Sequence, residues 1–373
     1  MKKQLKLFLF FLFIGLLIRL FISYFQYSGD IKNHLVWANG FINSPFGFYE
    51  QKFPGFNDPN YPPLAIIFFG ISQLLYISAK WLILSLNEFS LFPSSLVPFI
   101  LSENTVYAFL KIPGIISDLL IAWLMFRSLQ LNKQKYPLLL SLAFIFNPAA
   151  IYVSSVWGQI ESVTMLFLIC ALMNRNKPRS LFYFTLAALT KQTALWLTPL
   201  YLLLWLKNQN SKQLIKGLFI SLTTFYLSYL LFGLSPIAAT KNYLNTLSGS
   251  STVVSDAAWN LWYFLLPVGT NDNYQIFGLS IRFISIILLL SFLVVLLKKL
   301  WWEKSQDKPI DYLLIWSLLV FFLQTRVHER HLYPALIFAL LSTLKITPKI
   351  SLFIIITIFY YLNLNWSLNL PFI

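Results

Sequence analysis

The stretch TRVHERHLYP, residues 325–334, places two of the chain's three histidines, two arginines and a carboxylate between two long apolar runs. Arg326 and Arg330 can each offer paired N–H donors to phosphate oxygens, and His328 can donate to the same group. A charged belt at a membrane surface is the alternative, but such belts usually combine Lys and Arg with Trp and Tyr. If a helix begins here, Arg326 and Arg330 share one face with Glu329 close by. The stretch therefore predicts a phosphate-binding site beside an apolar wall.

A second candidate centre follows the first apolar run, where Asp30 stands in a polar loop. A carboxylate near an acceptor hydroxyl can take its proton as a new bond forms, so Asp30 is the candidate general base. The same residue would also suit the N-cap of an amphipathic helix over residues 31–43. His34, four residues later, would share its helical face. Trp37 and Tyr61 of the same loop are further candidates for substrate contact.

A third group of polar residues lies at the ends of later apolar runs. Lys191 in LTKQTAL is flanked by apolar runs, so it either snorkels to the surface or pairs, and a phosphate is a suitable partner for its ammonium. Gln159 and Glu161 stand at a turn between two helices, either as helix caps or as substrate ligands. The remaining candidates for substrate contact on this side of the chain are Gln192, Trp259, Asn260, Trp262 and Glu329.

The metal-binding patterns that a sequence can reveal are missing from these stretches. The first loop has no D-x-D or E-x-D pattern, and a hard divalent ion prefers clustered carboxylates. The histidines lack H-x-x-x-H and H-E-x-x-H spacing, and the single cysteine, Cys170, lies in an apolar run. We therefore expect no metal and no cofactor.

The elements that position these residues must be membrane helices. Hydrophobic residues make up 58% of the 373-residue chain, charged residues 11%, and the mean hydropathy is +0.68. Apolar runs of about 20 residues recur without strand-like alternation, which predicts an all-α, polytopic membrane protein rather than a barrel. The net charge of +15 does not indicate nucleic-acid binding, because the basic residues form no stripe with interleaved aromatic residues. Membrane lipids are the expected surroundings.

The basic residues also give the expected orientation. The first run is too long for a signal peptide, so we expect a retained helix with Lys2, Lys3 and Lys6 on the cytoplasmic side. Later basic clusters also fall on that side if the next helices cover 105–128, 137–153, 161–174, 179–191, 193–207, 214–234, 274–297, 310–325, 331–345 and 350–365. These clusters are Lys133/Lys135, Arg175/Lys177/Arg179, Lys207/Lys212/Lys216, Lys298/Lys299/Lys304/Lys308 and Lys345/Lys349.

This orientation predicts one membrane domain over residues 1–373 with about 11–13 transmembrane helices. Residues 26–63 would form a long first extracytoplasmic loop containing amphipathic helices. Residues 64–101 are either a hairpin of two spans or helices that lie in the interface. The three histidines and most carboxylates then gather on the outer side, which favours a reaction site for a membrane-bound substrate.

The polar motifs occur in an order that resembles a known family. The first loop resembles the first lumenal loop of the dolichyl-phosphate-glucose-dependent glucosyltransferases that extend the N-glycan precursor, through Gly29-Asp30, His34, Trp37, Tyr49 and Tyr61-Pro62-Pro63-Leu64. That family's later motifs are similar to Asn147-Pro148, Lys191-Gln192 with Pro199, and His328-Glu329-Arg330, where the family usually has Lys at the last position. More broadly, the chain resembles the GT-C class of multi-helix enzymes that take sugars from polyprenyl-phosphate carriers.

The resemblance implies an inverting hexosyltransferase of the plasma (inner) membrane with an extracytoplasmic active site. It would move a hexose from a polyprenyl-phosphate donor to a lipid-linked or other glycan acceptor. By this resemblance Asp30 would be the base, and His328 and Arg330 would hold the donor phosphate. The chemistry of the residues adds Lys191 and Arg326 as further candidates for phosphate binding. The alternative function is a flippase or transporter of lipid-linked sugars, which would need polar residues at mid-membrane depth, where Asp118 is the clearest.

Overall fold

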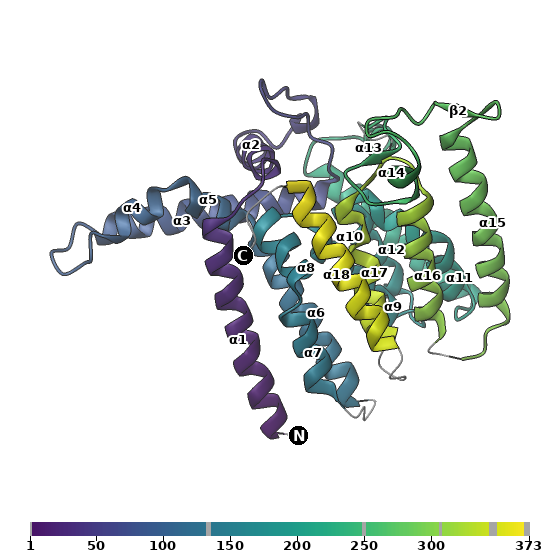
Figure 1. The fold of residues 1–373 in the computed structure, drawn as a ribbon. Helices are drawn as coiled ribbons and strands as arrows, with labels where there is room; N and C mark the ends of the chain where they lie inside the picture. Colours follow the sequence, from purple (N-terminus) through teal and green to yellow (C-terminus); the bar gives the residue numbers. More distant parts are fainter. Residues whose placement is uncertain (1, 132–135, 248–250, 306–307, 343–348, 369–373) are drawn as a thin grey trace.

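Figure 1 shows the fold in a computed structural model, which describes residues 2–131, 136–247, 251–305, 308–342 and 349–368. Helices dominate, as the sequence predicts. The first half of the chain contains α1 (Lys2–Phe25), α2 (Asp30–Asn43), the 3-10 helix η1 (Phe48–Glu50), α3 (Pro63–Leu86), α4 (Leu96–Leu101), α5 (Glu103–Leu110), α6 (Ile112–Leu131), α7 (Pro137–Ile145), α8 (Pro148–Ile151), the π-helix η2 (Tyr152–Trp157) and α9 (Glu161–Met173).

The second half adds more helices and four two-residue strands. The helices are α10 (Arg179–Thr190), the 3-10 helix η3 (Gln192–Leu197), α11 (Thr198–Leu206), α12 (Ser211–Leu230), α13 (Pro236–Leu247), α14 (Leu261–Leu265), α15 (Ile281–Trp302), α16 (Lys308–Leu323), the 3-10 helix η4 (Glu329–Leu332), α17 (Tyr333–Ser342) and α18 (Lys349–Leu368). The strands form two pairs, β1 (Ser255–Asp256) with β4 (Val327–His328) and β2 (Gln275–Ile276) with β3 (Leu279–Ser280).

Five of the described helices are long and apolar enough to cross a membrane, namely α1, α3, α6, α15 and α18. A sixth candidate is α7 together with α8 and η2, which meet at a bend of 41°. Among the described residues, the number of helices that are long and apolar enough to cross a membrane is therefore lower than the predicted 11–13. Several expected spans are shorter helices, such as α9 with 13 residues and α10 with 12. The basic residues Lys133, Lys135 and Lys345 lie outside the described residues.

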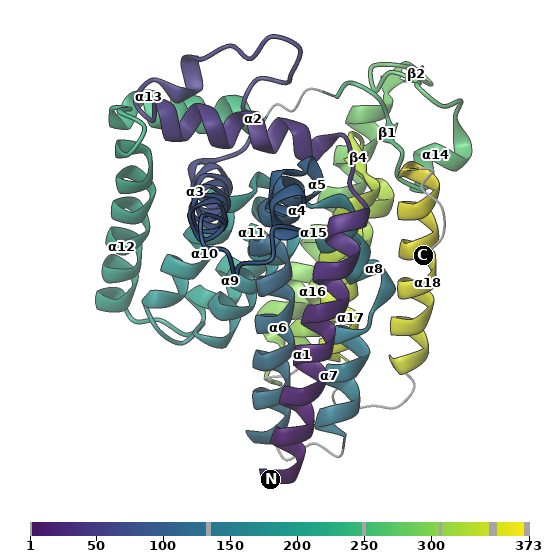
Figure 2. The same ribbon diagram turned by 90° about the vertical axis from the view of Figure 1, so that its left-hand side faces the viewer.

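The helices follow two main directions. In both views α1, α6 and α7 run side by side, whereas α3 runs crosswise to them (Figures 1 and 2). Residues 64–101 therefore do not form a hairpin of two long spans, because α3 is followed by the six-residue α4. The N-terminus lies at one end of the upright helices, and α2, α13 and α14 gather at the opposite end, which we call the loop end. The polar residues of α2, α13 and α14 therefore lie together at one end of the bundle of upright helices.

The upright helices are joined by a buried polar network. Asp118 of α6 forms an ion pair with Arg19 of α1 (Nε to Oδ2, 3.4 Å), and both side chains are fully buried. Asp118 also accepts hydrogen bonds from Ser162 of α9 (2.7 Å) and from the Tyr333 hydroxyl of α17. Arg19 donates further to the carbonyl of Ile145 in α7 (2.7 Å). The network therefore fixes five helices relative to one another.

The Arg19–Asp118 pair gives a stability prediction. Arg19→Met should lower the free energy of unfolding by about 3–5 kcal/mol, because it leaves the Asp118 carboxylate as a buried charge without its cation. Lys52→Met breaks the Lys52–Asp58 pair, whose side chains are largely exposed, and is the matched control. It should change stability little, as exposed pairs usually contribute little. The measurement is thermal unfolding of the detergent-purified proteins, and equal melting temperatures for both variants would contradict the prediction.

Candidate active site

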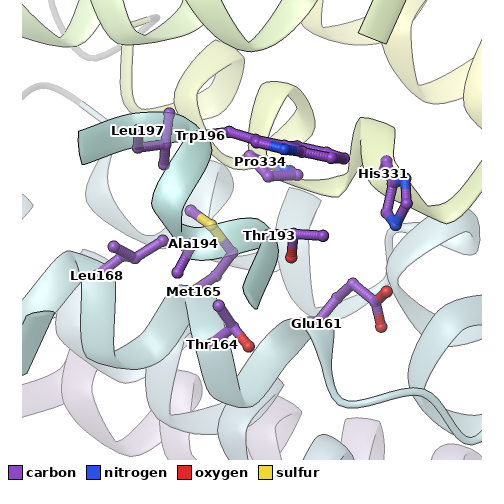
Figure 3. Close-up of a pocket in the computed structure, with 10 residues that line it drawn as sticks. All are labelled: Glu161, Thr164, Met165, Leu168, Thr193, Ala194, Trp196, Leu197, His331 and Pro334. Carbon is purple, nitrogen blue, oxygen red and sulfur yellow. The ribbon is translucent and has the colours of Figure 1, made fainter. Parts of the chain in front are cut away.

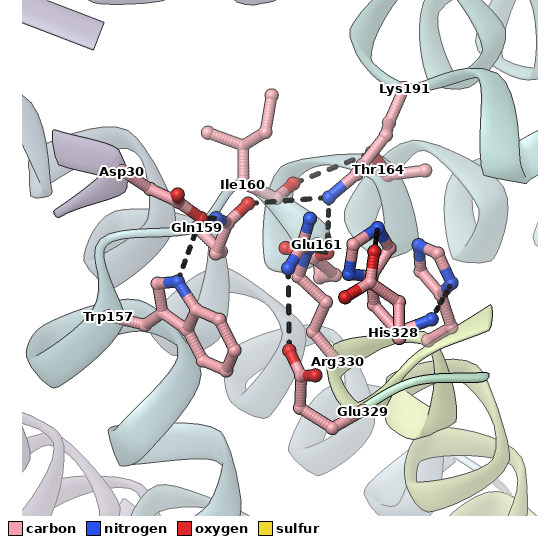
Figure 4. Close-up of polar contacts among 12 residues, drawn as sticks. Asp30, Trp157, Gln159, Ile160, Glu161, Thr164, Lys191, His328, Glu329 and Arg330 are labelled. Carbon is pink, nitrogen blue, oxygen red and sulfur yellow. Dashed lines mark hydrogen bonds and ion pairs between the residues drawn. The ribbon is translucent and has the colours of Figure 1, made fainter. Parts of the chain in front are cut away.

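The candidate base, Asp30, is the first residue of α2 and reaches across to the end of η2. Its carboxylate accepts hydrogen bonds from the Trp157 indole (3.0 Å) and from the Gln159 amide (2.6 Å), as Figure 4 shows. The cap position of α2 is Gly29 and the cap makes no side-chain hydrogen bond, so the helix-cap interpretation of Asp30 is wrong. The side chain is directed instead into a cluster built by segments far away in the sequence.

A glycine turn connects the partners of Asp30. Gly158 lies between η2 and α9 with φ of +80°, a conformation that favours glycine. A Cβ added there would also lie 2.8 Å from Ile31 Cδ1, so the turn packs closely on α2. The turn allows Trp157 and Gln159 to reach Asp30 while Glu161 begins α9. Residues 157–161, which we call the WGQIE turn, are the centre of the site.

Two buried cations face the WGQIE turn. The Lys191 ammonium, at the end of α10, pairs with Glu161, lies 3.3 Å from Gln159 Oε1 and stands over the Tyr61 ring at 5.3 Å. Lys191 is 3% exposed, so it pairs rather than snorkels. The cap of α9 is Ile160 and makes no side-chain hydrogen bond, so Glu161 is an ion-pair partner rather than a helix cap.

Arg330 supplies the second cation from η4. Its guanidinium lies 3.8 Å from Glu161 Oε1, 3.3 Å from Glu329 Oε1, and 5.3 Å from the Trp157 ring centre. Tyr360 of α18 donates a hydrogen bond to the Arg330 carbonyl (2.9 Å), which holds this backbone in place. Lys191 and Arg330, which are distant in sequence, thus both lie close to the Glu161 carboxylate (Figure 4).

The pKa values of the two carboxyl groups, Asp30 and Glu329, are shifted in opposite directions. Burial alone would raise the pKa of Asp30, but the Arg330 guanidinium, the Trp157 hydrogen bond and the Lys191 ammonium hold it below its usual value. Asp30 is therefore an ionised carboxylate near neutral pH. Burial raises the pKa of Glu329 to about 7, although Arg330 opposes this shift. Glu329 therefore changes charge near neutral pH.

The TRVHERHLYP stretch differs from the expected helix. Arg326 has a φ of +63°, Val327 and His328 form strand β4 beside β1, and the 3-10 helix η4 follows. Arg326 and Arg330 therefore do not share a helical face, because pairing with the loop before α14 extends the backbone. The Arg326 guanidinium binds both carboxylate oxygens of Asp272 (2.7 and 3.2 Å).

The two histidines of this stretch lie next to each other. His328 Nε2 is 3.5 Å from Asp256 Oδ2, and the His328 backbone N–H donates to His331 Nδ1 (3.0 Å). Burial, followed by the nearby Arg330, holds the pKa of His328 well below its usual value. His328 is therefore neutral at physiological pH and can donate one N–H to a phosphate.

Three residues predicted from the first loop form an aromatic wall beside the cluster. His34 stacks on Phe69 with ring centres 4.2 Å apart, and burial lowers its pKa to about 3, so it is neutral. Tyr61 donates its hydroxyl hydrogen to Gln159 (2.9 Å), and Trp37 donates to the carbonyl of Asn57 (2.8 Å). Tyr61 touches the polar cluster directly, whereas His34 and Trp37 are buried behind it.

The other predicted substrate contacts are placed differently. Asn260 caps α14 by accepting from the Tyr263 N–H (2.9 Å), and Trp262 donates to the Leu323 carbonyl (2.7 Å). The Trp259 ring packs 5.9 Å from the Phe359 ring. These contacts join the loop after α13 to α16 and α18. Gln192 lies closer to the first loop, with its amide 3.5 Å from the Asn60 carbonyl and 3.3 Å from that of Thr246.

The sequence reasoning missed two residues, one within the cluster and one behind it. The Trp157 indole binds Asp30 and lies under Arg330, yet it was not among the predicted site residues. Its place in WGQIE, two residues before the candidate Gln159, could have indicated it. Lys111 was also missed, although it is a lysine between apolar stretches, the same signal that pointed to Lys191.

A small cavity of about 20 Å³ lies beside Glu161 and His331 (Figure 3). Its other lining residues are mostly apolar and come from α9, η3 and α17, namely Thr164, Met165, Leu168, Thr193, Ala194, Trp196, Leu197 and Pro334. The arrangement offers an apolar cavity next to a charged group. Within the described ranges, no three side chains of His, Cys, Asp or Glu are grouped so that they could hold a metal ion.

The site thus combines an ionised carboxylate, two buried cations and an adjoining apolar pocket at the loop end of a helical bundle. This arrangement can accept a proton at one point and hold an anion at another. In comparisons with known proteins, no family model matches the chain and no curated protein matches its sequence.

Proposed function

We propose that the chain is an inverting GT-C-type glycosyltransferase. It moves a hexose from a polyprenyl-phosphate carrier to a lipid-linked or other glycan acceptor on the extracytoplasmic face of the plasma membrane. The observation that carries this proposal is the convergence of the Asp30 carboxylate with Lys191 and Arg330 on the WGQIE turn. A base and an anion-binding pair within one cluster are the two groups that such a transfer requires.

The reaction is a single displacement at the anomeric carbon of the donor sugar. The acceptor hydroxyl oxygen bonds to this carbon while the bond to the phosphate oxygen breaks, and positive charge develops on the ring. Asp30 takes the hydroxyl proton, and the leaving electron pair stays on the polyprenyl phosphate. Lys191 and Arg330 stabilise the charge on that phosphate, and His328 is a further donor. Attack from the side opposite the phosphate inverts the configuration.

The apolar surroundings suit a lipid-linked donor. The small cavity beside Glu161 is lined mainly by apolar groups, so an apolar wall adjoins the cations, and the first part of a prenyl chain can pack against it. The deep charges fit a transport path less well. Arg19 and Asp118 are fully buried and bonded to each other, which supports packing between helices rather than passage of a polar cargo.

Asp30→Asn tests the base. The variant keeps the size of the side chain but cannot take a proton, so turnover should fall by roughly 10²–10⁴-fold while donor binding is retained. The measurement is hexose transfer from a panel of short-chain polyprenyl-phosphate sugars. Asp58→Asn, in the same loop but exposed, is the control and should retain activity. Transfer by Asp30→Asn within a few-fold of wild type would remove Asp30 from the role of base.

Arg330 tests the phosphate-binding pair. Arg330→Ala removes a charge-assisted contact of about 1.5–3 kcal/mol, so the donor kcat/KM should fall by roughly 10–100-fold. Arg330→Lys should lose less, because it keeps the charge but not the paired donors. Arg282→Ala, which removes an exposed arginine at the start of α15, is the control. If Arg330→Ala raised only the acceptor KM, Arg330 would belong to the acceptor site instead.

Glu329 gives a pH prediction. Its pKa of about 7 means that the carboxyl is mostly neutral below pH 7 and charged above it. The charged form competes with the donor phosphate for Arg330, so the donor KM should rise by roughly 3–10-fold as pH increases from about 6 to 8. Glu329→Gln should keep the donor KM nearly constant over this range. The same rise in Glu329→Gln and in wild type would assign the pH dependence to another group.

A further inference from the structure

Lys111 is a buried cation that the proposed reaction does not use. It lies between α5 and α6, and it is 1% exposed. Its ammonium donates to the backbone carbonyls of Ser23 (2.9 Å), Gln26 and Ser155 (2.9 Å). Two of these acceptors lie at the end of α1, and the third lies in the second half of η2. One side chain therefore joins the ends of two segments that are distant in sequence.

The chemistry of this contact explains why a lysine stands there. The last carbonyls of a helix lack partners within the helix and carry partial negative charge. An ammonium has three N–H donors and no acceptor, so it satisfies three carbonyls at once. Burial lowers the pKa of Lys111 to about 7, whereas the three carbonyl acceptors favour its charged form.

Both segments that Lys111 joins lead directly into the candidate site. Gln26 stands four residues before Asp30, and Ser155 stands two residues before Trp157. The Ser28 hydroxyl adds a second link by donating to the Trp157 carbonyl (3.0 Å). The WGQIE turn also packs on the lysine stem, since a Cβ at Gly158 would lie 3.1 Å from Lys111 Cγ.

We propose that Lys111, assisted by Ser28, is a positioning residue for Asp30. It holds the end of α1 against the end of η2, so that the Trp157 indole and the Gln159 amide stay within hydrogen-bond distance of the Asp30 carboxylate. The role assigned to Lys111 rests on the proposed function of Asp30 as the base. Lys111 itself touches backbone carbonyls rather than the cluster of reacting groups.

The consequence of losing this contact can be measured at Asp30. Without the ammonium, the two helix ends lose their common partner, and small displacements are enough to lengthen the bonds from Trp157 and Gln159. A carboxylate that loses hydrogen bonds to its charged form becomes easier to protonate. The pH at which Asp30 takes up a proton should therefore rise, even though Arg330 stays in place.

The test follows the reaction of Asp30 with a water-soluble carbodiimide, which requires the protonated carboxyl, across a pH series by mass spectrometry. In Lys111→Met, the midpoint for Asp30 should lie about one pH unit or more above that of wild type. Lys111→Arg keeps a cation with several donors and should shift the midpoint less. Lys207→Met is the matched control, because Lys207 also donates to three backbone carbonyls, at the end of α15.

An unchanged midpoint in folded Lys111→Met, or equal shifts in Lys111→Met and Lys207→Met, would overturn the proposal. If Lys111→Met fails to fold, Ser28→Ala decides. A smaller shift in the same direction supports the proposal, and an unchanged midpoint overturns it. The labelling does not depend on hexose transfer. A wild-type protein that consumes none of the polyprenyl-phosphate sugars would therefore contradict the proposed function. The labelling result would still test whether Lys111 positions Asp30.

Discussion

The carboxylate of Glu161 is the contact around which the site is arranged. Lys191 and Arg330 both approach the same oxygen of this buried group, from the end of α10 and from η4. Buried charges are costly unless they lie close to opposite charges, so the three side chains hold their backbones together. Because Glu161 begins α9 directly after the WGQIE turn, the same contact places that turn against Asp30. The position of the candidate base therefore depends on how two distant cations are neutralised.

This charge arrangement also explains how the cluster can receive an anion. Lys191 and Arg330 are partly balanced by Glu161 and by Asp30, whose pKa is held down by Arg330 and the Trp157 hydrogen bond. Glu329 adds a charge that depends on pH, because burial raises its pKa to about 7. A protonated Glu329 leaves the Arg330 guanidinium with fewer negative neighbours. The arginine can then bind an incoming phosphate without a large rearrangement of the site.

The sequence predicted the helical class and much of the cluster, but not the path of the backbone. Asp30 and Lys191 were visible because charged residues beside apolar runs need a specific reason. The segment before α17 was predicted as a helix, but pairing of β1 with β4 connects residues about 70 positions apart and extends Val327 and His328. Lys111 carried the same signal, but the sequence does not show its role, because its partners are backbone carbonyls. The predicted number of membrane spans also exceeded the number of long apolar helices, because hydropathy does not reveal where an apolar run is broken.

The site is supported from within the bundle by the first turn of α9. Glu161 faces the cations, while the next residue, Ser162, donates to Asp118 in the network that includes Arg19. The end of η4 is held in a similar way, because Tyr333 follows it directly and also donates to Asp118. Two adjacent residues on α9 and one on α17 thus connect the polar cluster to packed helices. A base and a pair of cations built on such rigid elements need less ordering when a substrate binds, which is the main advantage of a preorganised site.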